Sequence, residues 1–193
     1  MSSDEAAAAA VTAAEQDTLL DVARQSIAHT LNHGEQIRLE IQDYPDRLRQ
    51  QRAAFVTLHL DHELRGCIGN LEAYQPVVLD VARNAYAAAF SDPRFLPVTM
   101  AEFERIDIHI AILNPAEEMQ FDSQTDLITQ LRPGIDGLII QQDGHRGTFL
   151  PSVWEQLPEP EQFFAHLKLK AGLSPKHWSP SLRVWRYITT SFP

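Results

Sequence analysis

The segment from Phe55 to Gly69 constrains the fold of this chain most strongly. Apolar and polar residues alternate over Phe55 to Leu60 and again over Leu64 to Gly69, and the polar stretch Asp61-His-Glu63 separates them. Alternation with a period of two is typical of strands, so the segment predicts a β-hairpin. The following stretch, Pro76 to Phe90, has an apolar stripe at helical spacing and a proline in its first turn. The hairpin is therefore expected to lead directly into a helix.

The rest of the chain alternates between helical and strand patterns. Helices are predicted over 15–33, 124–131, 152–156 and 161–170, and strands over 106–113, 138–141, 148–150 and 182–189. The turn Asp143-Gly144 lies between two of these strands and favours a second hairpin. Because hairpins dominate the pairing, the sequence predicts an α+β fold with a mixed, largely antiparallel sheet packed with helices.

Charge and composition exclude several classes of function. The 193 residues include 26 acidic and 16 basic side chains, for a formal net charge of −10, so the chain has no bulk attraction for nucleic acid or for anionic membranes. No apolar run reaches the roughly 18–20 residues of a membrane span. One cysteine cannot form an intramolecular disulfide, which favours the cytoplasm. Residues 1–14 lack the basic start of a signal peptide and are expected to form a disordered or helix-extending tail.

The LRGCIG segment (residues 64–69) carries the candidate chemistry. In an extended strand Arg65, Cys67 and Gly69 share one face, which places a cation and the only thiol about 6–7 Å apart at the backbone. A nearby guanidinium favours the thiolate, and the flanking glycines leave the space beside it uncrowded. Cys67 is therefore a candidate nucleophile or acid/base group, and Arg65 a candidate partner for a carboxylate or phosphate. The alternative is that Cys67 is a small buried core residue.

Other polar residues either join this site or are structural. Asp92 and Arg94 flank a proline just after the predicted helix, where they form a self-satisfied turn or add an acid and a second cation to the site. Two histidines are candidate bases: His62 in the turn, and His59 on the partner strand if the register places it on the Cys67 face. His29 and His33 have helical spacing for a metal pair without an evident third ligand, so no metal site is predicted. Because dinucleotide and phosphate-loop fingerprints are also missing, no cofactor is expected.

Five short segments together resemble the AMMECR1 domain family. They are LRGCIGN at 64–70, SDPRF at 91–95, GIDGL at 134–138, the R…LP-x-V pattern from Arg146 to Val153, and KAGL at 170–173. The resemblance runs from about 16 to 192. It implies that 15–193 form a single domain, described for this family as a larger lobe and a smaller lobe with a cleft between them. The family's prokaryotic members include protein A of the AmmeMemoRadiSam system, which implies Memo-like and radical-SAM proteins as partners.

Three hypotheses of function follow. The leading one is a cytoplasmic enzyme, or a component of an enzyme system, that acts on a small anionic molecule. Its catalytic residues would be Cys67 and Arg65, and its substrate-binding residues Gly66, Gly69, Asp92 and Arg94. The second is a non-enzymatic binding or adaptor domain in which the LRGCIG segment is structural. The third is a regulatory protein associated with nucleic acid, against which the net charge argues.

Overall fold

The computed structural model describes residues 11–193, which divide into two compact units. Residues up to Asn114 together with Thr190–Pro193 belong to the first unit, and Pro115–Thr189 form the second. Most of the predicted tail lies outside the described residues. In its described part, Thr12 caps helix α2 (Ala13–His33) by accepting a hydrogen bond from the backbone of Glu15, and Ala13 and Ala14 extend the predicted helix at its start. Within residues 11–193, no helix combines the length and apolar character that a membrane span requires.

The first unit is built on a four-stranded sheet with the order β2-β1-β3-β8. The predicted hairpin is confirmed as β1 (Ala54–Leu60) and β2 (Glu63–Gly69), which pair antiparallel. The two-residue turn between them has Asp61 and His62 at positive φ, 52° and 70°, which matches the right-handed twist of the flanking strands. β3 (Ile106–Leu113) pairs antiparallel with the other side of β1, and β8 (Thr189–Phe192) follows at the edge.

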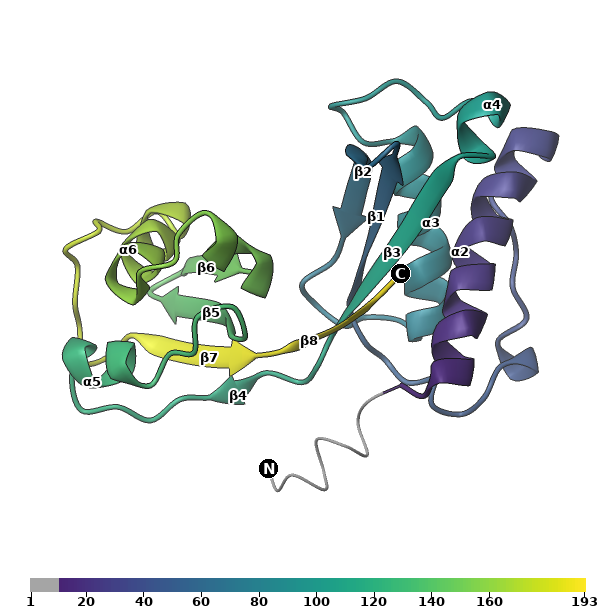
Figure 1. The fold of residues 1–193 in the computed structure, drawn as a ribbon. Coiled ribbons are helices and arrows are strands. Elements are labelled where there is room, and N and C mark those ends of the chain that lie inside the picture. The colour runs from purple at the N-terminus through teal and green to yellow at the C-terminus, as the bar shows by residue number, and fades with distance from the viewer. Residues whose placement is uncertain (1–10) are drawn as a thin grey trace. The chain divides into compact units, whose positions relative to one another are not determined.

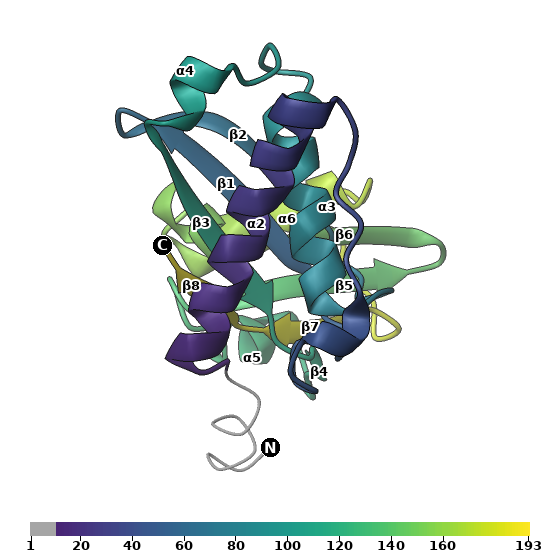
Figure 2. The ribbon, with the colours of Figure 1, turned by 90° about the vertical axis from the view of Figure 1, so that its right-hand side faces the viewer.

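Two long helices cover one face of this sheet, as Figures 1 and 2 show. They are α2 and the predicted helix after the hairpin, α3 (Val77–Phe90); the short η1 (Ile41–Asp43) and α4 (Met100–Phe103) complete the unit. Val78 and Val81 of α3 pack with Val56 of β1, and all three are fully buried. Each such side chain contributes about 1.5–3 kcal/mol on burial, so the contact between α3 and the sheet stabilises this unit substantially.

The opposite face of the sheet carries no helix of this unit, and we call it the helix-free face. Its residues alternate along the strands with the buried ones. On β1 they are Phe55, Thr57 and His59; on β2, Cys67 and Gly69; on β3, Asp107 and His109. The register brings Cys67, Thr57 and His109 into one row across three adjacent strands, because Thr57 is the Cα partner of both others.

The second unit is a second four-stranded sheet with its own core. Its strand order is β4-β7-β5-β6, and every strand pair is antiparallel. The elements are β4 (Glu117–Glu118), α5 (Gln124–Thr129), β5 (Gly137–Gln142), β6 (His145–Phe149), η2 (Pro151–Glu155), α6 (Pro160–Lys170) and β7 (Arg183–Tyr187). Trp154 of η2 stacks on Phe163 of α6 with ring centroids 3.7 Å apart, and this pair packs in the core of the unit with Leu138, Ile140 and Val184.

The α+β class with largely antiparallel pairing is confirmed, and the strands form two sheets. Two details of the prediction are wrong. The predicted strand 182–189 is divided into β7 and β8, which belong to different sheets, so its alternation reflects two different cores. The predicted helix 152–156 is a 3₁₀ turn that begins at Pro151. The short elements α4 and β4 lack the length at which periodicity can be recognised.

Candidate functional site

Cys67 lies on β2, the edge strand of the first sheet, and its backbone is held from outside the sheet. The amide of Cys67 donates to Asp92 Oδ2 at 2.9 Å, and its carbonyl oxygen accepts from Arg94 Nη2 at 3.2 Å. An edge strand leaves one row of backbone groups without a strand partner. Asp92 and Arg94 therefore supply the backbone hydrogen bonds that a neighbouring strand would otherwise make to Cys67, and they fix its position at the sheet edge.

Asp92 and Arg94 are also paired with each other. Arg94 Nη2 lies 2.7 Å from Asp92 Oδ2, and Arg94 Nε donates to Asp92 Oδ1 at 2.9 Å. Asp92 is only 4% exposed, whereas the Arg94 side chain is 53% exposed. The hydrogen bonds from Arg94, together with the amide of Cys67, hold the pKa of the Asp92 carboxyl far below its ordinary value. The same pairing raises the pKa of Arg94. The turn therefore satisfies itself, as the structural interpretation expects, and it also binds the backbone of Cys67.

The thiol of Cys67 lies on the helix-free face and contacts a hydroxyl. Thr57 Oγ1 donates to Cys67 Sγ at 3.3 Å. The register also places His59 on this face, which settles the question that the sequence left open. The imidazole rings of His59 and His109 meet edge to face with centroids 4.9 Å apart. Sequence reasoning missed Thr57 as the hydrogen-bond partner of the Cys67 thiol, since only the strand register shows that these two residues are neighbours.

The two glycines of the LRGCIG segment are required by packing. A Cβ on Gly66 would lie 2.2 Å from the carbonyl oxygen of Ala88 in α3, which is far inside contact distance. A Cβ on Gly69 would lie 2.3 Å from Cγ of Phe55 on β1. Gly66 therefore allows α3 to approach the hairpin, and Gly69 makes room for an aromatic ring. Neither position needs a ligand to explain its glycine.

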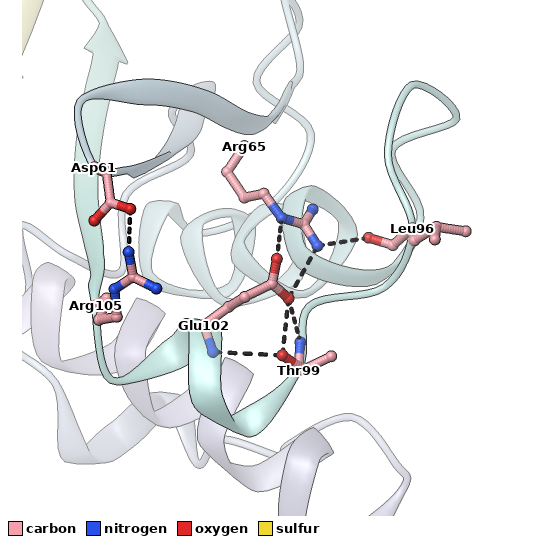
Figure 3. Close-up of polar contacts among 6 residues, drawn as sticks. All are labelled: Asp61, Arg65, Leu96, Thr99, Glu102 and Arg105. Carbon is pink, nitrogen blue, oxygen red and sulfur yellow. Dashed lines mark hydrogen bonds and ion pairs between the residues drawn. The ribbon is translucent and has the colours of Figure 1, made fainter.

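The side chain of Arg65 binds Glu102 and the backbone of Leu96, as Figure 3 shows. Its Nε and Nη2 donate to the carboxylate of Glu102 at 2.8 and 3.3 Å, and Nη2 also donates to the carbonyl oxygen of Leu96 at 2.9 Å. The expected alternation is interrupted, because Leu58 pairs with Gly66 while His59 pairs with Leu64. Arg65 thus lies in a β-bulge, which redirects a side chain relative to a regular strand. The regular alternation on which the shared face of Arg65 and Cys67 is predicted is therefore interrupted, and the cation that contacts Cys67 is Arg94.

Glu102 is held as a carboxylate by its two neighbours. The hydrogen bond from Arg65, and then that from the backbone of Thr99, lower the pKa of Glu102 to about 2 from its ordinary 4.5. Thr99 and Glu102 form a capping box at the start of α4, so one carboxylate joins this short helix to β2. A second ion pair in Figure 3, between Asp61 and Arg105, connects the hairpin turn to the residue before β3.

Replacing Glu102 with glutamine should lower stability at neutral pH by about 1–2 kcal/mol, because the pair with Arg65 is largely shielded from water. A carboxyl whose pKa is lowered by folding stabilises the protein above its unfolded pKa and loses this effect as the pH falls. The difference between wild type and Glu102→Gln should therefore disappear between about pH 4.5 and about pH 2. Thermal unfolding followed against pH measures it. Glu104→Gln, at an exposed position nearby, is the control; a difference that persists unchanged at low pH would contradict the assignment.

The described part of the chain offers no metal centre. Within residues 11–193, no three His, Cys, Asp or Glu side chains are grouped so that they could hold a metal ion. His29 and His33 lie one turn apart on α2, and their rings contact each other at 4.5 Å between centroids. The candidate site is thus a thiol with a hydroxyl and imidazoles on one face of a sheet, and a buried carboxylate and a half-exposed guanidinium at its edge.

Comparisons with known proteins identify the family to which this chain belongs. The AMMECR1 family model matches residues 20–192. A protein of Methanothermobacter thermautotrophicus is 37% identical over 180 residues, which cover 92% of this chain and 93% of that protein. Protein MJ0810 of Methanocaldococcus jannaschii is 37% identical over 163 residues, or 80% of this chain and 79% of that protein. The crystal structure of the uncharacterized protein PH0010 from Pyrococcus horikoshii has a TM-score of 0.77 at 29% identity, covering 90% of this chain and 88% of that one. The chain therefore belongs to the AMMECR1 family.

Proposed function

We propose that this chain provides a thiol-dependent reactive site, as an enzyme or as one component of an enzyme system, in which Cys67 is the nucleophile. The proposal rests on one observation: the residues around Cys67 have structural roles that fix its backbone, whereas its thiol has no such role. Gly66, Gly69 and Arg65 are occupied by packing and an ion pair, and the Cys67 backbone is held on both sides. The half-buried thiol accepts a hydrogen bond from the Thr57 hydroxyl, and Arg94 lies close enough to the Cys67 side chain that their interaction helps to raise the pKa of Arg94. A thiol fixed in this way is positioned for reaction.

The substrate that best fits this site is a small anion. Arg94 uses Nε and Nη2 for Asp92 and Cys67, so its Nη1 donors are available, and half of the side chain is exposed. Arg65 Nη1 is enclosed and has no hydrogen-bond partner among residues 11–193. The guanidiniums of Arg94 and Arg65 lie 5.4 and 5.7 Å from the centroid of the same ring, Phe95. Of the two guanidiniums, the half-exposed one of Arg94 is the one that a carboxylate or phosphate ligand can reach.

The proposal includes the setting that the family resemblance implies. We place the protein in the reducing cytoplasm, where a lone thiol remains free, and beside Memo-like and radical-SAM proteins. With one cysteine, this sequence cannot supply the three thiolates of an iron–sulfur cluster, so radical chemistry in such a system would take place in a partner.

The single cysteine makes the test specific, since alkylation reports on one atom. Iodoacetate is anionic and iodoacetamide neutral, so the ratio of their rates measures attraction of an anion. We expect this ratio to exceed that of free glutathione by about tenfold, and to fall as salt is raised. Arg94→Gln should reduce the ratio, whereas Arg105→Gln, which removes a surface arginine of the same unit, should not. A ratio equal to that of glutathione would exclude the anion site.

A binding or adaptor domain is the second candidate, and a specific observation favours it. Most of the LRGCIG segment has a structural role in this fold, as expected for an adaptor in which the segment is not catalytic. The two functions predict different reactivities for the Cys67 thiol. An adaptor in which Cys67 only fills space would have a thiol that reacts no faster than glutathione with either reagent.

A further inference from the structure

We propose that the second unit carries a ligand site of its own, on the face of its sheet opposite the core, and that this site binds a small aromatic carboxylate. The inference goes beyond the proposed thiol site and does not depend on it, because every residue of the new site belongs to Pro115–Thr189. It assigns a role to side chains of β5, β6 and β7 that the proposed function does not use.

The alternation along β5 separates the two faces of this sheet. Leu138 and Ile140 pack in the core of the second unit with side chains of α5, α6 and η2. Successive side chains of a strand point to opposite faces, so Ile139 and Gln141 lie on the other face. We call this the outer face of the second sheet.

The strand register places an apolar row beside a cationic row on the outer face. Trp185 of β7 is the Cα partner of Ile139. Gln141 has Arg183 of β7 as its partner on one side and Arg146 of β6 on the other. Neighbouring strands are about 4.8 Å apart, so two arginines flank one neutral amide about 10 Å apart at the backbone. A ring over the first row would thus lie beside two guanidiniums.

A cavity of about 270 Å³ opens on this face. It is lined by Ile139, Gln141, Arg146 and Trp185, and by Ala116. Small-molecule sites are typically apolar recesses with a few polar groups that orient the ligand, and their volumes are about 300–1,000 Å³. This cavity is near the lower end of that range. Its size and its lining therefore suit a molecule of one or two rings with a single charged group.

The contacts of Arg183 indicate the charged group. Its Nε and Nη2 donate to the carboxylate of Glu118 at 2.7 and 3.0 Å, and its guanidinium lies 4.7 Å from the ring centroid of Trp185. The planar fork of an arginine fits a carboxylate while its face stacks on a ring, and both arrangements occur here in one side chain.

Glu118 is a competitor that a ligand can displace. The pair between Arg183 and Glu118 is exposed on both sides, 58% and 38%, and exposed ion pairs are weak. A ligand carboxylate over Gln141 would take donors from Arg183, Arg146 and the exposed Gln141 amide, while its ring contacts Trp185. The geometry thus supplies a charged end and an apolar end for one small molecule.

The test follows the indole N–H signals of the nitrogen-labelled full chain by two-dimensional NMR while naphthoate is added. The chain has three tryptophans, and the spectrum of Trp185→Phe identifies the signal of Trp185. This signal should shift until saturation, with a dissociation constant on the order of 1 mM. The signal of Trp154, whose indole donates to the carbonyl oxygen of Asp136 in the core, should not move. Naphthamide, which has the same rings without the charge, should bind about fivefold more weakly.

Two charge variants test the site in opposite directions. Arg146→Gln should weaken naphthoate binding about fivefold, whereas Arg105→Gln, the same change in the first unit, should not alter it. Glu118→Gln removes the competing carboxylate and should tighten binding about threefold. Glu155→Gln, at an exposed position elsewhere in the second unit, makes the same change of charge and should leave binding as it is.

Two results would overturn the proposal. If the Trp185 signal does not move at about 10 mM naphthoate, the cavity is not a ligand site. If naphthoate and naphthamide bind equally well, and Arg146→Gln and Glu118→Gln bind like wild type, the outer face is only an apolar surface and the carboxylate assignment is wrong. Neither result bears on the alkylation of Cys67, so the thiol site stands or falls separately.

Discussion

Replacing Gly66 with alanine is expected to destabilise the first unit by about 3 kcal/mol or more. The added methyl group would lie 2.2 Å from the carbonyl oxygen of Ala88, and backbone cannot move aside as a flexible side chain can. Relief requires that α3 separate from the hairpin. This separation would loosen the packing of Val78 and Val81, both fully buried in the core of the unit, against the sheet. The cost is therefore not confined to one clash.

Two optical probes make this prediction measurable. The long helices α2 and α3 belong to the first unit, so the helical circular dichroism signal largely follows that unit. Trp154, Trp178 and Trp185 all lie in the second unit, so tryptophan fluorescence follows the other. In urea, the dichroism transition of Gly66→Ala should move to lower concentration.

Gly144→Ala is the matched control for this experiment. It adds the same methyl group into open space, at a position where only the positive φ of 84° costs about 1–2 kcal/mol. It also lies in the second unit, so it should leave the dichroism transition of the first unit in place. A Gly66→Ala protein with a dichroism transition like that of wild type would show that α3 does not need the close approach.

The sequence predicts the elements of this fold better than their assembly. The hairpin and α3 follow from alternation, a turn and an N-terminal proline, all of which are local signals. The division of 182–189 between two sheets is not local. Ile188 lies between β7 and β8, and nothing in the alternation marks the point where the chain passes from one core to another. Which strands pair is decided by burial against partners far away in the chain, and a single-strand pattern does not contain that information.

The candidate site shows the same limit at the scale of single residues. Cys67, Asp92 and Arg94 are brought together because the helix after the hairpin returns Asp92 to the edge of β2. Arg65 does not join them, because a bulge of one residue redirects it toward Glu102. A bulge changes which side chains share a face without any change in composition. The same register decides that Thr57 adjoins the thiol, which no spacing in the sequence shows.

Replacing Asp92 with alanine should cost about 2–4 kcal/mol of stability in the first unit. The substitution leaves the amide of Cys67 without its acceptor and leaves Arg94 without its carboxylate. Arg94 is half exposed and can be rehydrated, so the cost lies below that of a fully buried broken pair. Asp92→Asn keeps an oxygen that can accept from the Cys67 amide and should lose about half as much.

The pH dependence of stability separates the contribution of the Asp92 charge from that of its hydrogen-bond acceptor. Arg94 holds the pKa of Asp92 below its ordinary 3.8, so the carboxylate stabilises the folded state fully above that pH and progressively less below it. Wild type should therefore lose its advantage over Asp92→Asn as the pH falls from about 4 into the acid range, while Asp92→Ala remains less stable than Asp92→Asn throughout. Urea unfolding followed by circular dichroism at several pH values measures both differences. Equal stability of the alanine and asparagine variants would show that the Cys67 amide does not depend on this acceptor, and the edge of β2 would then need another explanation.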